Sequence, residues 1–285
     1  MFTPCSFSVA LPALKAGEIL RLACGADDVP AGASRAIAVV RPEDLPANAL
    51  PVGTVLGAES GALLKIEGRA FWPGWERALF LARVLADISS GVRILKTART
   101  GCALAVVTLS DKGFAGLRED ESGPALVDMV RKALPLCHER RFLLPDEPAR
   151  LRALVLELAG QGYDLVISTG GTGLSPRDLT PEALIPILDR RLPGFEQVMM
   201  AASLEKTPRA VLSHGSGQRL CFSPCRAAAV PLWRIWKRCL RQCPTPWKSW
   251  AGTCLTAGEN RTFFNLRRVP RTPAHFMLRR FPAAS

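Results

Sequence analysis

A glycine-rich loop at residues 168–173 is the strongest chemical signal in this sequence of 285 residues. It reads Ser-Thr-Gly-Gly-Thr-Gly and directly follows a short apolar run typical of a buried strand. Glycines let the backbone approach a ligand and present N–H groups to phosphate oxygens. The loop residues expected to present these N–H groups to a phosphate are Thr169, Gly170, Gly171, Thr172 and Gly173. A purely structural turn would use the same glycines, so the loop alone does not decide its role.

Acidic side chains follow three expected strands. Ser110-Asp111 and Asp146-Glu147 each close an apolar run, and Arg177-Asp178 lies shortly after the glycine loop. Because parallel strands end at one edge of a sheet, these groups should meet beside the loop. Carboxylate oxygens hold Mg²⁺, and backbone amides hold phosphates, so the combination suits a Mg²⁺–nucleotide site. Taken singly, each acid could instead cap a helix.

The elements around these groups alternate between strand and helix. We expect strands at 102–109, 141–144 and 164–168, and helices at 122–134 and 148–159, from their apolar spacing. A further helix should begin at Thr180-Pro181-Glu182, with Thr180 as its cap. Such alternation indicates a mainly parallel sheet with helices on both faces.

The region before residue 99 contains no comparable constellation. Short stretches at 36–40, 53–56 and 62–66 resemble strands, and 75–88 has the apolar spacing of a helix. We therefore expect a small β-rich region at 1–98 whose role the sequence does not reveal. Cys24 and the pair Trp72 and Trp75 are interpreted as packing residues.

Residues 102–213 resemble the molybdopterin adenylyltransferase family, which includes the G domain of gephyrin. The matching stretches are VTLSDKG at 107–113, the D-x-S-G of 120–123, LLPDE at 143–147, STGGTGLSPRDLTPEA at 168–183, LPGF at 192–195 and TPRAVLS at 207–213. They occur in the order and spacing of the family. This stretch covers about 110 of the 285 residues.

The resemblance implies a three-layer α/β/α fold that binds Mg-ATP and molybdopterin. The phosphate of molybdopterin would attack the α-phosphate of ATP and release pyrophosphate, a step that depends on positioning and charge neutralisation. By the same resemblance, Asp146 and Asp178 match the essential acids and would hold Mg²⁺. The loop Thr169–Gly173 would cradle the nucleotide or pterin phosphate, and Ser110 and Asp111 would line the same cleft. Arg177 would neutralise phosphate charge or form a surface salt bridge.

Other functions fit parts of the same pattern. Molybdotransferases and the competence-damage-type nucleotide hydrolases share this subdomain, but usually depart from the T-G-G-T-G and R-D-x-T-P-E-A motifs. A non-enzymatic scaffold that binds molybdopterin is an alternative of another class. Trimers are common in the family, so the resemblance allows a homotrimer, although the sequence itself does not reveal the oligomeric state.

The tail at 214–285 differs sharply from the rest of the chain. It holds 13 Lys and Arg against one acid, Glu259, and therefore carries the whole net charge of +12. Five of the nine cysteines and four of the six tryptophans also lie there. Without helical or strand periodicity, this composition does not indicate nucleic-acid binding. Its two C-x3-C pairs do not have the usual spacing of a zinc site.

An out-of-frame reading accounts for this tail. Shifting the frame over 220–258, with free choice of synonymous codons, gives a sequence that starts L-L-F-P-L-P-G-S and continues as a charged amphipathic pattern. Family members carry a similar L-P-G turn after TPRAVLS. Some positions involve no choice, because Trp236-Lys237 and Trp247-Lys248 both force Glu. We hypothesise a frame switch within 213–219, which would remove the last strand and helix and uncover the sheet edge.

Two further features of the sequence bear on the expected cellular location. No apolar run approaches the roughly 20 residues that span a bilayer, and no basic residue precedes the apolar patch near the N-terminus. We therefore expect a cytoplasmic protein without membrane association.

Overall fold

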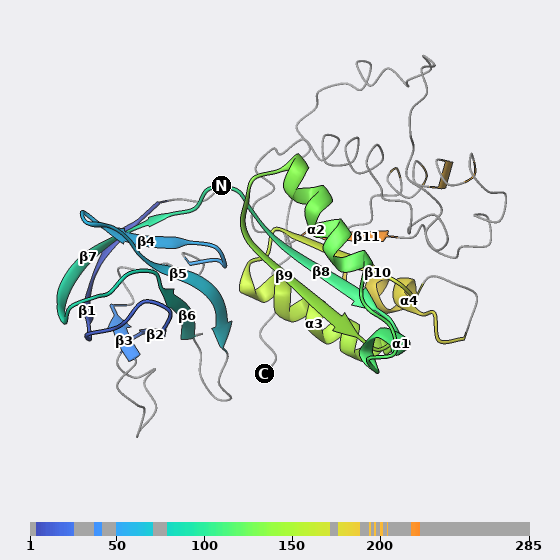
Figure 1. Ribbon diagram of the computed structural model, residues 1–285, viewed down its shortest axis with the longest axis horizontal. Coiled ribbons are helices and arrows are strands. Elements are labelled where there is room, and N and C mark those ends of the chain that lie inside the picture. Colours follow the sequence, from blue (N-terminus) through green and yellow to red (C-terminus); the bar gives the residue numbers. More distant parts are fainter. Residues whose placement is uncertain are drawn as a thin grey trace, which may run out of the picture.

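The computed structural model describes residues 4–25, 37–41, 50–70, 79–171 and 176–188, five single residues between 194 and 204, and the backbone of 218–222. Within these residues the chain forms two units that lie side by side, a β-barrel and an α/β domain (Figure 1). The β-rich region expected before residue 99 is therefore confirmed and is a closed barrel.

Seven strands form the barrel: β1 Ser6–Leu11, β2 Ile19–Cys24, β3 Ile37–Val40, β4 Val55–Ala58, β5 Gly61–Ala70, β6 Leu79–Val84 and β7 Gly91–Ala98. Their order is β1-β3-β2-β6-β5-β4-β7, and β7 pairs with β1 to close the ring. Only β2 and β3 run parallel among these pairs. Closure leaves no unpaired sheet edge in this unit.

Alternating side chains fill the barrel. In β1, Phe7, Val9 and Leu11 are buried, whereas Ser6, Ser8 and Ala10 face outward. This two-residue period is what a strand with one buried face requires. Each of the other strands contributes buried apolar residues to the same cluster, which includes Cys24 of β2, so the interior is a packed core.

One expected helix of the barrel region is wrong. Within the predicted helix at 75–88, residues 79–84 form β6, with Phe80, Ala82 and Val84 buried at a two-residue spacing. Residues 75–78 and Trp72 lie outside the described residues. The apolar run there fits both the helical period of 3.6 residues and the strand period of two residues. Its pairing with β2 and β5 makes it a strand. The strands expected at 36–40, 53–56 and 62–66 correspond to β3, β4 and β5.

The α/β domain is built on a four-stranded sheet in the order β11-β10-β8-β9. Its strands are β8 Cys102–Leu109, β9 Leu136–Leu144, β10 Leu165–Thr169 and β11 Gln218–Phe222. Its helices are α1 Asp111–Phe114, α2 Ser122–Ala133, α3 Pro148–Gln161 and α4 Thr180–Leu184, with a 3₁₀ turn at Ile185–Ile187. β8 runs parallel to β9 and β10, whereas β11 runs antiparallel to β10.

Helices cover both faces of this sheet (Figure 1). On one face, α2 packs Leu126 and Val130 against Leu104, Val106 and neighbouring residues of β10. On the other face, α3 and α4 pack against Ala105, Val107 and Val166. β8 is consequently buried on both sides, as its continuous apolar run predicts.

Two strands of the sheet differ from expectation. β9 begins at Leu136, five residues before the predicted strand. The prediction missed its first residues because β9 lies at the sheet edge and carries the charged run Glu139–Arg141. Charged residues are common on exposed edge strands and hide the apolar pattern. β11 comes from the tail, so the expectation that the tail leaves this edge uncovered is wrong. A backbone ladder requires only an extended segment, even where no patterned face accompanies it.

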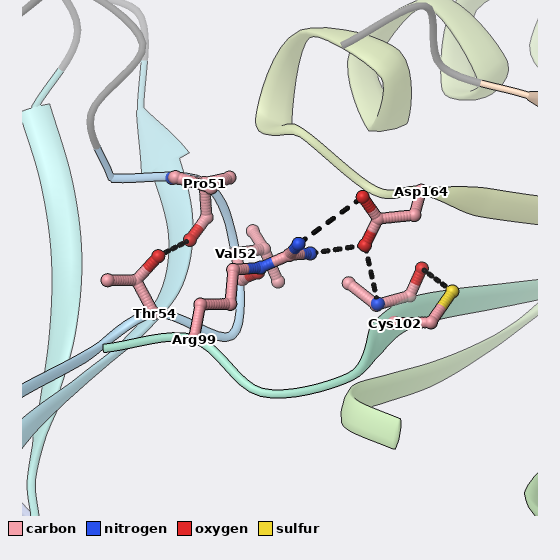
Figure 2. A network of polar contacts seen from close by, with 7 residues as sticks. Pro51, Val52, Thr54, Arg99, Cys102 and Asp164 are labelled. Carbon is pink, nitrogen blue, oxygen red and sulfur yellow. Dashed lines mark hydrogen bonds and ion pairs between the residues drawn. The ribbon is translucent and has the colours of Figure 1, made fainter. Parts of the chain in front are cut away.

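Arg99 joins the barrel to the α/β domain (Figure 2). It lies just after β7, with only 5% of its side chain exposed. Its guanidinium donates to the carbonyl of Val52 at 3.0 Å and to both carboxylate oxygens of Asp164. Asp164 also accepts the N–H of Ala103 at 2.8 Å. One arginine thus ties a barrel loop to the starts of β8 and β10.

The segment before β4 completes this joint. Val52 is fully buried within the core of the α/β domain, and its N–H donates to the carbonyl of Gln161 at 3.2 Å. Gly162, with φ +82°, lies so close to Pro51 that an added Cβ would approach the proline Cβ within 2.8 Å. The two units share side chains across this contact, so we expect them to unfold together.

His138 and Tyr163 form a polar pair near this joint. His138 Nε2 lies 3.1 Å from the hydroxyl of the fully buried Tyr163. Burial, reinforced by the positive charge of Lys65, lowers the pKa of His138 to about 4 from an ordinary value of 6.5. Burial also raises the pKa of Tyr163 to about 12. The folded protein therefore holds both rings neutral over a wide pH range.

This pair predicts a loss of stability in acid. The unfolded chain protonates His138 below about pH 6.5, whereas the folded chain resists protonation down to about pH 4. The free energy of unfolding should then fall over this interval by on the order of 2 kcal/mol from this group. Urea unfolding at about pH 6.5 and about pH 4 should show a smaller fall in the free energy of unfolding for His138→Gln than for the unmodified chain, because glutamine does not titrate. An equal fall in the two proteins would contradict the assignment.

Candidate functional site

The carboxyl ends of β8, β9 and β10 meet at one edge of the sheet. β8 ends next to Ser110-Asp111, β9 next to Asp146, and β10 next to the two glycines of the loop. The register places Leu109 opposite Leu144 and Thr108 opposite Thr169, so the three ends are level. In parallel α/β sheets this edge is where ligands bind.

Asp111 and Asp146 hold each other through the backbone. The carboxylate of Asp111 accepts the N–H of Asp146 at 3.1 Å, and Asp146 Oδ2 accepts the N–H of Asp111 at 3.4 Å. These reciprocal bonds connect the loops after β8 and β9. They bring together two of the acids that the sequence predicts to share a site.

The second carboxylate oxygen of Asp146 is buried and has no hydrogen-bond partner among the described residues. Burial raises the pKa of Asp146, and the negative charges of Asp111 and Asp178 raise it further, against lowering contributions from the Asp111 N–H and from Arg177. A buried acceptor without a donor costs free energy. This oxygen is therefore suited to a cation or a donor brought by a ligand.

Arg177 and Asp178 reach the same edge from the segment before α4. Arg177 forms an ion pair with Asp111 Oδ2 at 2.9 Å, with 65% of its side chain exposed. Asp178 is half-buried, and its charge acts on Asp146. Asp111 thus contacts both Asp146 and Arg177, and Asp178 acts on Asp146 through its charge.

The glycine loop packs tightly against its neighbours. Gly170 has φ +98°, and a Cβ there would collide with the carbonyl oxygen of Leu109. Gly171 has φ +60°, and a Cβ there would collide with Thr180 Oγ1 and lie 3.6 Å from Asp146 Oδ1. Both positions therefore require glycine. The close approach places the loop beside the unpartnered oxygen of Asp146.

The remaining predicted residues have mixed outcomes. Ser110 lies at the edge, but its hydroxyl accepts the N–H of Gly113 at 3.1 Å and caps α1. Thr169 is buried at the end of β10. Thr172 and Gly173 lie outside the described residues. The ligand-binding roles of all four stay predictions.

A further acid, Asp120, organises this edge. It accepts the N–H of Gly123 at 2.9 Å and the hydroxyl of Thr108 at 3.2 Å. These bonds fasten the start of α2 to the end of β8. The D-x-S-G motif at 120–123 is the sequence signal for this anchor, although pattern reasoning assigned it no role.

Thr180 does not cap α4, contrary to the prediction. Leu179 precedes the helix and makes no side-chain cap bond, whereas Thr180 is the first helical residue. Its hydroxyl instead donates to the carbonyl of Gly170 at 3.0 Å. The hydroxyl thus donates to the glycine loop, whereas a helix cap would accept an N–H of the first turn.

The donor set suits a magnesium ion that also binds substrate. In the described part of the chain, no three His, Cys, Asp or Glu side chains gather as a metal-binding group. Mg²⁺ usually takes one or two protein carboxylates and completes its shell with water and substrate phosphates. Asp146 and Asp178, with the unpartnered Oδ1 of Asp146, fit that pattern.

Sequence comparison matches this edge to a known family. The profile described as a probable molybdopterin binding domain matches residues 105–238. This range includes all three strand ends and the glycine loop. The α/β domain therefore matches the family described as a probable molybdopterin binding domain. The match extends beyond Ser213, where the recognised motifs end, and includes β11.

Curated relatives agree with this assignment. The α/β domain is 39% identical over 117 residues to molybdopterin adenylyltransferase of Haemophilus influenzae, covering 40% of this chain and 59% of that protein. It is 36% identical over 117 residues to gephyrin of Dictyostelium discoideum, covering 38% of this chain and 16% of gephyrin. The chain thus spans about three fifths of the bacterial relative.

A solved structure is also similar in sequence. The molybdopterin biosynthesis enzyme MoaB of Thermus thermophilus is 38% identical, with a TM-score of 0.38, over 42% of this chain and 79% of that one. Separately, the helices in the described part of the chain are all too short or too polar to cross a membrane.

Proposed function

We propose that the α/β domain adenylylates molybdopterin in molybdenum cofactor biosynthesis. The phosphate oxygen of molybdopterin attacks the α-phosphorus of ATP, the bond to the β-phosphate oxygen breaks, and pyrophosphate leaves. The observation that carries this proposal is the buried, unpartnered Oδ1 of Asp146 beside Gly171. Relatives named molybdopterin adenylyltransferase support the choice of reaction.

Some residues at this edge position the phosphates, and others neutralise their charge. The glycine loop presents backbone groups to the phosphates, and its tight packing fixes them before the substrate arrives. Asp111 holds Asp146 in place through their reciprocal bonds. Arg177, exposed at the rim, contributes a positive charge close to the phosphates once its pairing with Asp111 loosens.

Asp146 and Asp178 are the residues proposed to hold Mg²⁺. When bound, the ion supplies charge neutralisation for the transferring and leaving phosphates. Asp146 and the glycine loop do not need the ion for their placement, because the contacts that position them lie within the chain.

The test is pyrophosphate release from Mg-ATP with and without molybdopterin. We expect release only when molybdopterin is present. ATP binding without any molybdopterin-dependent release would favour the alternative of a molybdopterin-binding scaffold. Light scattering of the same preparation would test the homotrimer that family resemblance allows.

We propose further that the tail is read out of frame from a point within 213–219. The concentration of the whole net charge of +12 after residue 213 supports this hypothesis. β11 is compatible with it, since the shifted reading keeps Leu220 and Phe222 and changes only the residue between them. The shifted reading also supplies the L-P-G turn and an amphipathic pattern, which the present tail lacks.

Restoring the frame should raise molybdopterin-dependent pyrophosphate release at least about 10-fold, because it restores the L-P-G turn that follows TPRAVLS in the family, and small displacements near a substrate cost this much or more. The measurement compares the chain as it stands with the frame-restored chain at equal concentration. Equal rates would contradict the hypothesis. Resequencing that confirms an unbroken frame through codon 285 would contradict it independently.

A further inference from the structure

Thr180 makes two bonds to the glycine loop. Its hydroxyl donates to the carbonyl of Gly170 at 3.0 Å, and its backbone N–H donates to the carbonyl of Gly171 at 3.2 Å. The residue is 5% exposed and begins α4. Two consecutive carbonyls of the loop are therefore directed toward one buried residue.

These bonds fix the direction of a backbone donor. A trans peptide group is planar, with its C=O and N–H on opposite sides. Holding the carbonyl of Gly170 therefore holds the N–H of Gly171, which must point away from Thr180. The positive φ of Gly170 and Gly171 gives both residues a wide conformational range when unrestrained. The hydroxyl bond removes much of that freedom.

The same hydroxyl lies where the loop meets the acids. A Cβ on Gly171 would collide with Thr180 Oγ1 and would lie 3.6 Å from Asp146 Oδ1. Thr180 thus packs against the part of the loop closest to the unpartnered oxygen of Asp146. Displacing the loop here would change the distance between its amides and that carboxylate.

We propose that Thr180 is a positioning residue, whose hydroxyl orients the N–H of Gly171 for a phosphate of the nucleotide. The identity of the ligand in this inference rests on the proposed function. The geometry is independent of the proposed function, because the orientation of the loop is measurable without substrate. A merely structural threonine would stabilise the chain without altering the loop amides or nucleotide affinity.

Thr180→Val tests the hydroxyl, because it keeps the shape of the side chain and loses the donor. The matched control is Thr54→Val, since Thr54 is also fully buried and donates its hydroxyl to a backbone carbonyl, that of Pro51, at 2.7 Å. Thr180→Ser retains the donor. All variants are made in the full chain, and their melting temperatures are measured alongside.

The first readout is amide hydrogen exchange at residue 180, followed by NMR without ligand, because its N–H donates to the carbonyl of Gly171 and is protected only while α4 stays in contact with the loop. Thr180→Val should accelerate exchange there about 5-fold or more, because the contact loses the hydroxyl bond to Gly170. Thr54→Val and Thr180→Ser should leave it within about twofold of the unmodified chain. Unchanged exchange in Thr180→Val would overturn the proposal, whatever the chain does with ATP.

The second readout is the Kd for Mg-ATP. We expect Thr180→Val to raise it about 10-fold, while Thr54→Val leaves it unchanged at a similar loss of melting temperature. Equal Kd values for the two valine variants would also overturn the proposal. If the unmodified chain binds no Mg-ATP, the proposed function fails, and the exchange measurement still decides whether Thr180 orients the loop.

Discussion

Replacing Asp146 by asparagine should reduce molybdopterin adenylylation at least about 100-fold, because the buried oxygen proposed to meet Mg-ATP loses its charge. Stability should change little. The fold already raises the pKa of this carboxyl through burial, so a neutral side chain of the same shape removes a desolvated charge. The measurement is the rate of molybdopterin-dependent pyrophosphate release in the frame-restored chain, with thermal unfolding of the same samples.

Asp128→Asn is the matched control for this substitution. Asp128 lies on α2 with 60% of its side chain exposed and pairs with Arg131 at 2.7 Å, so its charge is screened by water. We expect its rate to equal that of the unmodified protein. A rate for Asp146→Asn within about threefold of that of Asp128→Asn would remove Asp146 from the mechanism.

Arg99→Met should destabilise the whole described structure by about 3 to 5 kcal/mol, the usual effect of removing one partner of a buried ion pair. It leaves the Asp164 carboxylate with the N–H of Ala103 and leaves the Val52 carbonyl without its side-chain donor. Because Val52 belongs to the core of the α/β domain, both units should lose stability together. Urea unfolding, followed separately in the barrel and in the α/β domain, measures the free energy of unfolding of each unit.

Arg83→Met is the corresponding control on the surface. Arg83 pairs with Glu67 at 2.6 Å, but 45% of its side chain is exposed, so its loss should be worth less than about 1 kcal/mol. Adding Asp164→Asn to Arg99→Met should recover part of the stability, because no unpaired charge remains. Two separate unfolding transitions in Arg99→Met, with an unaltered α/β domain, would show that the joint does not couple the units.

The sequence predicts the α/β domain well because its elements are long and locally patterned. β8 is a continuous apolar run, and α2 carries a regular apolar stripe, so neither depends on distant partners for recognition. The barrel is harder to predict. β6 is apolar enough for either period, and only pairing with β2 and β5 makes it a strand. Such non-local pairing leaves no local signal.

The site divides in the same way. Asp111, Asp146 and Asp178 are predictable because each follows a strand or loop whose end must lie at one edge. The pairing of Arg177 with Asp111 and the orientation of Thr180 are not, since both depend on side-chain geometry between separate loops. Thr180 fits the pattern of a helix cap, and only the proximity of the Gly170 carbonyl gives its hydroxyl another partner.

The most direct test of the central claim follows the adenylyl group itself. ATP labelled in its α-phosphate is incubated with Mg²⁺, molybdopterin and the frame-restored chain, and the pterin is separated and counted. We expect the label to appear on molybdopterin in step with pyrophosphate release, and to disappear with Asp146→Asn. Label that stays with ATP or AMP, while molybdopterin is bound and unmodified, would contradict the account.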